Sequence, residues 1–284
     1  MTTLLIITHD EEEKLTRNLP LLLSQQGAED YEVVVVDMNS EGNTIELLNT
    51  LEESHRHLRH LSLPTSARDI SRERLALHLG MRAANTKNVL ILRPGIQVPD
   101  EQWLANVEKR WRTDGDIILI PTKRVRSKGG RDFFTAGHEA WRKSLNLKQA
   151  QKHNLFRAAS NVVGLNKEKF LTYNSPARHL ALKTGTLDIF ISHTATVYNT
   201  IIITETSLVP HEEPINSSHL WAQMRLFDVE TRKHLTRKSK WCFTYILHCI
   251  TSIHKGSIPY SIMDAYDYLR WSLTRKKTFI KKHY

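Results

Sequence analysis

Short, wholly apolar runs alternate with longer stretches of mixed polarity through the first 120 residues of the chain. The clearest apolar runs lie at residues 4–7, 33–36, 89–92 and 117–120. Strands without polar positions are typical of a parallel sheet that is covered on both faces, because neither face meets water. Between the runs, apolar residues recur at helical spacing. The pattern therefore predicts an α/β fold in which a mixed, mainly parallel sheet lies between helices.

The alternation weakens after Pro121. The segments expected there are a basic loop, a long helix, a strand that enters a turn, a β-rich run and a further helix, at residues 123–132, 134–154, 158–170, 194–210 and 217–235. No linker is evident before residue 230, so we expect one domain over residues 1–230. A basic, partly apolar helical extension is expected over residues 231–284.

The formal net charge of +10 is confined to the C-terminal segment. Residues 231–284 hold 12 Lys and Arg but only 2 acidic residues, so the remaining 230 residues balance to zero. A neutral body with a basic extension favours an anionic partner, such as a membrane surface, a nucleic acid or an acidic glycan. A solvated helical face would have the same composition. Because no nucleic-acid-binding motif accompanies the basic residues, we expect an anionic membrane surface and no nucleic acid.

A 13-residue, mostly apolar stretch, Trp241 to Ile253, lies inside this extension between basic segments. It is shorter than the roughly 18 residues that a membrane span needs, and it suits a segment lying on an anionic surface. The alternative is a pair of helices packed on the domain. Cys242 and Cys249 predict buried thiols in a reducing compartment. With no signal peptide evident, we expect a cytoplasmic protein, attached peripherally to the inner face of the cytoplasmic membrane.

Chemistry is expected where the apolar strands end, because open α/β sheets bind ligands at the carboxyl edge of their strands. The first strand runs into Thr8-His9-Asp10-Glu11, and the second ends in "VDMNSEGNT" at residues 36–44. The helical segment "SRERLALHLGMRAA" at residues 71–84 precedes the strand that ends in Arg93-Pro94-Gly95. Taken in this order, these segments resemble family 2 glycosyltransferases of the GT-A fold, in particular bacterial members.

Three later segments extend the resemblance to about residues 3–240. "ASNVVGLNKEKF" at residues 159–170 is similar to the strand and turn that line the acceptor side in the family. "KTGTLDIFIS" at residues 183–192 is similar to the segment that bears the catalytic base. "WAQMRLF" at residues 221–227 is similar to a motif that helps to hold the diphosphate or the acceptor.

The resemblance also implies a reaction and its residues. A nucleotide-sugar would donate its sugar to a cell-surface or lipid-linked glycan, with inversion, while a carboxylate takes the proton of the acceptor hydroxyl. Asp188 stands at the position of that base. The candidate nucleotide-sugar-binding residues are Asp10, Glu11, Asp37, Arg93, Gln223 and Arg225. Arg225 is offset from the usual arginine position of its motif, where Leu226 stands.

The chain departs from the family at the acidic motifs. Met38 stands where a second acid would follow Asp37, which leaves open whether Asp37 contacts the nucleotide or only bonds to nearby backbone N–H groups. Arg93-Pro94-Gly95 replaces the Asp-x-Asp pair of the metal motif. Since Mg²⁺ and Mn²⁺ prefer oxygen ligands, we expect no metal at this motif, and at most a weak dependence on either ion. Arg93 would place a fixed cation beside the diphosphate instead.

Two functions are compatible with these departures. The first is a glycosyltransferase that works without the usual metal, with the basic loop at residues 123–131 either closing over the diphosphate or forming a solvated turn. The second is a catalytically inactive family member that binds a nucleotide-sugar or a glycan, or serves as a scaffold for another glycan-synthesis enzyme.

Overall fold

The computed structural model describes residues 1–28, 30–63, 72–111, 115–125, 130–153, 156–158, 161–173, 186–213, 224–226, 228–229, 231, 235, 260–267 and 269. The chain forms two compact units, each built from segments that are separate in the sequence. The first unit comprises Met1–Lys123, Asn161–Leu180 and Thr196–Glu213, and the second comprises Arg124–Ser160, Ala181–Ala195 and Pro214–Tyr284. The boundary expected near residue 230 stays a prediction, because few residues around it belong to the described part.

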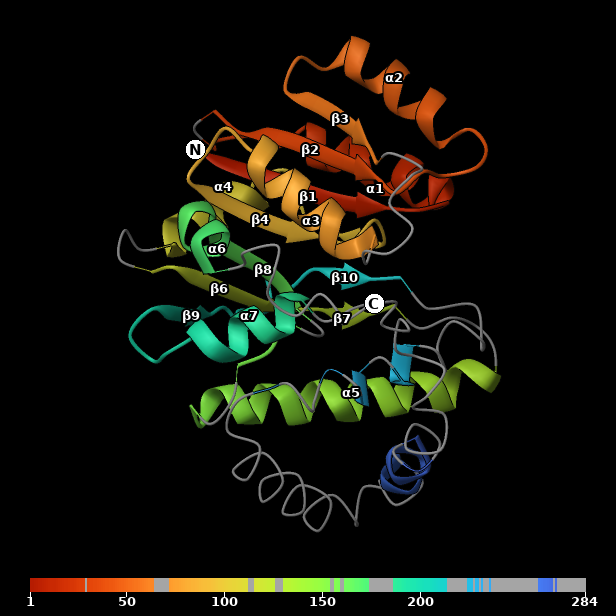
Figure 1. Cartoon of the computed structure of the whole chain (residues 1–284), viewed down its shortest axis with the longest axis vertical. Coiled ribbons are helices and arrows are strands. Elements are labelled where there is room, and N and C mark those ends of the chain that lie inside the picture. The colour runs from red at the N-terminus through yellow and green to blue at the C-terminus, as the bar shows by residue number, and fades with distance from the viewer. Residues whose placement is uncertain are drawn as a thin grey trace, which may run out of the picture. The chain divides into compact units, whose positions relative to one another are not determined.

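The first unit is built on a sheet that has seven strands within the described residues (Figure 1). In spatial order these are β3 (Leu58–Ser62), β2 (Glu32–Asp37), β1 (Thr2–Thr8), β4 (Asn88–Leu92), β8 (Asn161–Asn166), β6 (Ile117–Pro121) and β9 (Thr200–Ile202). β8 runs antiparallel to both of its neighbours, and the other pairs are parallel. The mixed, mainly parallel sheet that the apolar runs predicted is confirmed.

β2, β1 and β4 are deeply buried neighbours in this sheet. Leu4 of β1 lies opposite both Val33 of β2 and Leu90 of β4, and none of these side chains is exposed to solvent. Burial of an apolar side chain of this size contributes about 1.5–3 kcal/mol. The wholly apolar runs therefore reflect burial on both faces of the sheet, as the sequence pattern indicated.

Helices cover both faces of the sheet (Figure 1). In the first unit they are α1 (Glu12–Leu23), α2 (Thr44–Ser54), α3 (Arg72–Ala83), α4 (Trp103–Arg110) and α6 (Lys167–Tyr173). α1 buries Leu15, Leu19 and Leu22, which recur at the spacing of one helix face. α3 approaches the sheet at Gly80, where an added Cβ would lie 2.4 Å from Leu5 Cδ1. Only glycine allows so close an approach of a helix to the strands.

Residues 167–173 form a helix, where the sequence pattern predicted only a turn after β8. The side-chain oxygen of Asn166 accepts a hydrogen bond of 3.1 Å from the backbone N–H of Lys169. An asparagine at this position satisfies one of the N–H groups that the first turn of a helix leaves without an intrahelical partner. The last residue of the strand therefore starts the helix, and Phe170 is buried beneath it.

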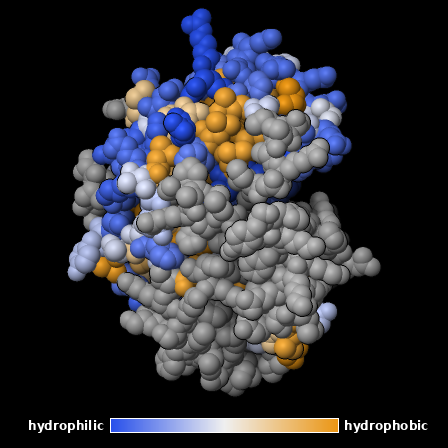
Figure 2. All heavy atoms as spheres, in the orientation of Figure 1, coloured by the Kyte–Doolittle hydropathy of each residue, from blue (hydrophilic) through white to orange (hydrophobic). Residues whose placement is uncertain are grey.

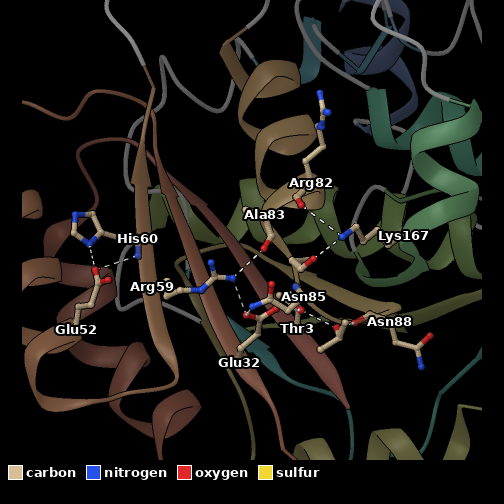
Figure 3. A network of polar contacts seen from close by, with 12 residues as sticks. Thr3, Glu32, Glu52, Arg59, His60, Arg82, Ala83, Asn85, Asn88 and Lys167 are labelled. Carbon is tan, nitrogen blue, oxygen red and sulfur yellow. Dashed lines mark hydrogen bonds and ion pairs between the residues drawn. The ribbon is translucent and has the colours of Figure 1, made fainter.

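A polar network ties together the amino ends of the strands (Figure 3). Glu32, at the start of β2, accepts hydrogen bonds from the Thr3 hydroxyl at 2.6 Å and from the Asn85 backbone N–H at 2.5 Å. Glu32 also pairs with Arg59 at 2.8 Å. Arg59 in turn donates to the carbonyl of Ala83, at the end of α3, at 2.9 Å. This edge is closed by structural contacts, and a ligand is expected at the opposite, carboxyl edge.

A second, smaller sheet contributes to that carboxyl edge. Its strand order is β5 (Ile96–Gln97), β10 (His211–Glu212) and β7 (Lys123–Arg124). β10 pairs with β5 in antiparallel fashion, with Glu212 opposite Ile96. Because β5 follows the turn after β4 directly, this pairing brings the end of the first unit to Arg93.

The second unit contains the long helix α5 (Gly130–Gln151), α7 (Thr186–Thr194) and a helix at residues 260–267. Trp141 and Leu145 of α5 and Ile191 of α7 are buried. The helix predicted at residues 134–154 is confirmed by α5.

Two sequence predictions fall largely or wholly outside the described residues. The helix predicted at residues 217–235 is represented by helical residues at 224–226 and 228–229. The stretch Trp241–Ile253, with both cysteines, lies outside the described part. Among the helices that the structure does describe, none is long and apolar enough to cross a membrane.

Candidate functional site

The parallel strands bring four predicted site residues to one edge of the large sheet. Asp37, the last residue of β2, lies opposite Thr8 at the end of β1. Arg93 directly follows β4, which also pairs in parallel with β1. Asp10 and Glu11 follow β1 itself. The placement expected for Asp10, Asp37 and Arg93 at the carboxyl edge is confirmed, whereas the roles of all four residues stay predictions.

Asp10 and Asp37 join the first two strand-end turns through Ser40. The Ser40 backbone N–H donates to Asp37 Oδ2 at 3.0 Å, and the Ser40 hydroxyl donates to Asp37 Oδ1. The Asp10 backbone N–H donates to the Ser40 oxygen at 2.8 Å, and Asp10 Oδ1 accepts from the Glu41 N–H at 2.7 Å. Asp10 and Asn39 have φ values of 53° and 63°, a conformation that Asp and Asn tolerate better than most residues.

The two aspartates of these turns differ in their exposure. Asp37 is fully buried, and both of its carboxylate oxygens accept hydrogen bonds from Ser40. The bond from the Ser40 backbone N–H is of the kind that the turn-forming interpretation of Asp37 predicted, and a contact with a nucleotide stays a prediction. Asp10 keeps 47% of its side chain exposed and lies 3.5 Å from His9. Glu11 pairs with Lys14 at the start of α1.

The turn after β4 presents a guanidinium instead of a carboxylate. Its backbone closes through a hydrogen bond of 3.0 Å from the Ile96 N–H to the Arg93 carbonyl. Arg93 Nη2 lies 2.6 Å from Glu212 Oε1, and Glu212 Oε2 accepts a hydrogen bond of 2.7 Å from the Thr122 hydroxyl. Glu212 is held with 15% of its side chain exposed, whereas Arg93 exposes 46%. The arginine is therefore fixed from one side and open to solvent on the other.

Glu213, the next residue, holds the other side of the same turn. Its backbone N–H donates to the Gly95 carbonyl at 2.9 Å. Its carboxylate pairs with Arg17 at 2.8 Å and accepts a weaker hydrogen bond of 3.2 Å from the Asn18 amide. The Asn18 amide also donates to the Pro94 carbonyl at 2.8 Å. The whole turn is thus clamped between α1 and β10.

Sequence reasoning did not find Glu212 and Glu213. The only signal was a pair of adjacent acids after the β-rich run, and adjacent acids are common on protein surfaces. Their contact with the Arg93 turn depends on the pairing of β10 with β5, two strands of two residues each. So short a strand has no periodicity from which its partner could be predicted.

The absence of a metal at this turn stays a prediction, which rests on the kinds of side chain found there. Arg93, Pro94 and Gly95 offer no carboxylate, and the nearby carboxylate of Glu212 already bonds to Arg93 and to Thr122. Within the described residues, no group of three or more His, Cys, Asp or Glu side chains is arranged to hold a metal ion. A positively charged side chain stands where the resemblance would place the acids.

Asp188, the predicted base, belongs to the second unit and lies in the first turn of α7. Its Oδ2 accepts a hydrogen bond of 2.9 Å from Arg157, which also lies 2.6 Å from Asp228 Oδ1. Arg142 pairs with Asp228 as well. Asp188 is 8% exposed and Arg157 is 3% exposed. The carboxylate is therefore one member of a largely buried cluster of charges, which the sequence did not reveal because Arg157 lies in an irregular segment.

The last two predicted site residues belong to one motif. Gln223 lies outside the described residues. Arg225 is described, is 7% exposed, and lies 3.3 Å from Asp267 within the second unit. In the basic loop, Arg124 pairs with Glu139 of α5 at 2.6 Å, so this cation is engaged inside the second unit. A donor-binding role for Arg225 stays a prediction.

Known proteins with a similar sequence pattern or a similar fold identify the family of this chain. The family model described as glycosyl transferase family 2 matches residues 3–171. Mannosyltransferase PcManGT from Pyrobaculum calidifontis, solved with GDP-Man and Mn²⁺, is 16% identical with a TM-score of 0.57, over 95% of this chain and 80% of that chain. TarS 1-349 of S. aureus, solved with UDP-GlcNAc, is 12% identical with a TM-score of 0.56, over 95% of this chain and 78% of that chain. No curated protein sequence gives a significant match.

At these identities the likeness to solved structures concerns the fold, which is the mainly parallel GT-A sheet described above. The family match extends over more than half of the sequence, from β1 into α6, and it includes the turns of Asp10, Asp37 and Arg93. The chain belongs to glycosyl transferase family 2.

Proposed function

We propose that this protein is a nucleotide-sugar-dependent glycosyltransferase that holds the diphosphate of its donor with Arg93 instead of a divalent metal. The observation that supports this most directly is that Arg93 is anchored and still partly exposed to solvent. The side chain is anchored by Glu212 at the carboxyl edge of the sheet, and it still exposes 46% of its surface. A guanidinium has five N–H donors in a planar fork, so it can remain paired with a carboxylate and also bond to phosphate oxygens.

The nature of the donor is supported by the structural neighbours. PcManGT was solved with GDP-Man, and TarS 1-349 with UDP and with UDP-GlcNAc. These proteins share the fold of this chain, and a nucleotide-sugar is therefore the donor class that we propose. The turns of Asp10 and Asp37 would receive the nucleoside, and Arg93 the diphosphate.

The proposed reaction is an inverting transfer to a cell-surface or lipid-linked glycan. The acceptor hydroxyl oxygen attacks the anomeric carbon, the bond from that carbon to the diphosphate breaks, and the nucleoside diphosphate leaves with the electron pair. A base takes the hydroxyl proton, and Asp188 is the candidate. Since Asp188 is paired with Arg157, it must accept this proton while it remains inside the charged cluster.

That pairing is also the specific observation that favours a second candidate function. A carboxylate in a largely buried ion pair is a common structural feature, and Arg93 has its own partner in Glu212. Both residues could serve only to hold the fold. The chain would then be an inactive family member that binds a nucleotide-sugar or a glycan, or acts as a scaffold for another glycan-synthesis enzyme.

The charge distribution supports a location at a membrane. We propose that the basic segment at residues 231–284 attaches the protein to the anionic inner face of the cytoplasmic membrane, where a lipid-linked acceptor would lie. This part of the proposal is independent of catalysis and would hold for either candidate function.

Calorimetric titration with UDP, GDP and their common sugar derivatives, in EDTA and then in Mn²⁺, tests the donor site. Saturable binding of one nucleotide with the same Kd in both buffers supports the Arg93 site. Binding that requires Mn²⁺ contradicts it. Binding without any release of free nucleotide from the sugar donor, even with a mixture of lipid-linked acceptors, favours the inactive family member. No binding of any nucleotide favours the scaffold.

A further inference from the structure

The helix at residues 260–267 in the second unit has two opposite stripes of side chains. The first stripe is Tyr260, Asp264 and Asp267, and the second is Ile262, Tyr266 and Leu269, which is also helical. Both stripes follow the spacing of one helix face. They are offset by two residues, which is about 200° around the helix axis. One stripe therefore faces away from the other.

The acidic stripe packs inward, against α5 and Arg225. His138 Nε2 lies 2.9 Å from Asp264 Oδ1, and Arg225 lies 3.3 Å from Asp267 Oδ1. Asp264 and Asp267 are 6% and 1% exposed. The Tyr260 hydroxyl occupies the space beside Gly137 of α5, where an added Cβ would lie 2.0 Å from it.

The apolar stripe faces outward. Ile262, Tyr266 and Leu269 are 64%, 57% and 61% exposed. Figure 2 shows a hydrophobic area on the surface at the place where Figure 1 draws this helix in blue. A surface helix normally buries its apolar stripe and exposes its charges, so this helix has the inverted arrangement. These buried contacts fix that arrangement, because rotation of the helix would separate Asp264 from His138 and Asp267 from Arg225.

The charge of the surrounding segment indicates what the apolar stripe meets. Asp264 and Asp267 are the only acidic residues among residues 231–284, which also hold 12 Lys and Arg. Both acids are buried in pairs, so neither opposes an anionic partner at the surface. Apolar and aromatic side chains within a basic segment match an anionic lipid surface, which offers negative head groups above an apolar layer.

The size of the stripe disfavours a second copy of the chain as its partner. A stable protein–protein interface buries about 800 Å² on each side, formed by roughly 20–30 residues. Three side chains on about two turns of helix are far from that area. A lipid surface needs no such area, because a few inserted side chains can add to the attraction of the basic residues.

We propose that Ile262, Tyr266 and Leu269 form the face by which the second unit inserts into an anionic membrane surface. This inference rests on the membrane location proposed above and names the contact face within it. The acidic stripe positions the face by pairing with His138 and Arg225, and the basic residues of the segment supply attraction to the head groups.

Vesicle sedimentation of the full chain tests the proposal, with phosphatidylcholine alone and with phosphatidylcholine mixed with phosphatidylglycerol. The test variant is Ile262→Ser with Leu269→Ser. The matched control is Val197→Ser with Tyr198→Ser, which removes exposed apolar side chains from the first unit. The wild type and the control are expected to bind the mixed vesicles and to keep part of this binding at high salt. The test variant is expected to lose the salt-resistant part and to bind at least about tenfold more weakly.

A second variant, Tyr266→Trp, keeps the test independent of any folding defect in the first. The wild type has six tryptophans, so the readout is the difference between the variant and the wild type. The variant's fluorescence should shift further to shorter wavelength with mixed vesicles, and brominated lipid should quench it more strongly. Equal binding of the test variant and the control, with no additional quenching, would overturn the assignment of this face while leaving the membrane location in place. Absence of wild-type binding to either vesicle would overturn both, and nucleotide titration would still test the donor site separately. A wild-type dimer that the test variant dissociates would instead assign the face to a second copy.

Discussion

Arg93 and Glu212 form an ion pair of 2.6 Å at the turn after β4, where the family pattern has a pair of aspartates. The exchange reverses the charge of the turn, and the chain supplies a carboxylate from β10 to face the new cation. Thr122 holds the second oxygen of that carboxylate at 2.7 Å. The pair therefore joins the large sheet to the small one through charge, as a metal ion joins the acids that coordinate it.

If Arg93 holds the donor diphosphate, Arg93→Ala should weaken nucleotide binding in EDTA by about 1.5–3 kcal/mol, that is, roughly tenfold to a hundredfold. A hydrogen bond to a charged group is lost, and Glu212 is left without its cation. The matched control is Arg110→Ala. Arg110 ends α4, and the substitution breaks its ion pair of 2.8 Å with Glu205. Calorimetry should show unchanged nucleotide affinity in the control. Equal affinity of the Arg93 variant and the wild type would remove Arg93 from the donor site.

Arg93→Asp should convert the turn into a weak cation site, because the new carboxylate would face that of Glu212. Divalent ions prefer such oxygen ligands, and Mn²⁺ would relieve the repulsion between the two acids. The signal of free Mn²⁺ in electron paramagnetic resonance should fall when this variant is added. At about 100 times its Kd, Mn²⁺ should add about 2.7 kcal/mol to the stability of the variant.

The wild type and the double variant Arg93→Asp with Glu212→Gln serve as controls for this gain of binding. Neither should change the Mn²⁺ signal at the turn, because the first has a cation there and the second has only one carboxylate. Binding by the double variant as strong as by Arg93→Asp alone would show that Glu212 is not the facing ligand.

The central sheet could be predicted from the sequence because its signal is local. Residues 33–36 are four valines, and such a run is expected wherever a strand is buried on both faces. The order of the strand-end turns then placed Asp37 and Arg93 at one edge, since parallel strands share their direction. What the sequence could not supply was the partner of each side chain. Glu212 reaches Arg93 only through the pairing of two very short strands.

The helix at residues 260–267 is a second case in which the sequence does not reveal the partners of the side chains. Its two stripes have identical spacing, and the usual rule turns Ile262 inward and Asp264 outward. The structure has the reverse, because His138 of α5 and Arg225 lie where the two aspartates can pair with them. Periodicity identifies the faces of a helix, and partners from distant parts of the chain decide which face is buried.

Asp188→Asn separates a catalytic from a structural role of the charged cluster. If Asp188 is the base, turnover should be abolished while donor affinity stays nearly unchanged, because the lost interaction matters mainly in the transition state. The free energy of unfolding should also fall by about 1–3 kcal/mol, since Arg157 loses the charge of one carboxylate partner. Kinetic assays with the best donor and urea unfolding measure the two effects.

The control for this variant is Asp116→Asn, which weakens a pair with the exposed Lys169 in the first unit. An exposed pair of this kind contributes at most about 1 kcal/mol, so both stability and turnover should change little. Turnover that persists in Asp188→Asn, together with reduced stability, would leave the carboxylate with a structural role alone.

The network around Glu32 should make the first unit sensitive to acid. Burial by itself would raise the pKa of this carboxyl, but hydrogen bonds from Thr3, Asn85 and Arg59 outweigh it and lower the pKa below the usual value. A group with a lowered folded-state pKa stabilises the fold above the unfolded pKa of about 4.3, and this stabilisation is lost as the pH falls through the folded-state pKa. Glu32→Gln should therefore reduce the loss of unfolding free energy on acidification from about pH 5 to pH 3, and should cost about 1–3 kcal/mol at neutral pH.

The control is Glu205→Gln. In the wild type, hydrogen bonding by Arg110 also lowers the pKa of the Glu205 carboxyl, but solvent screens this exposed pair. The acid dependence of the control should therefore stay close to that of the wild type. Parallel urea titrations across this pH range measure both slopes, and the same slope for Glu32→Gln and the wild type would show that the network is not what acid disrupts.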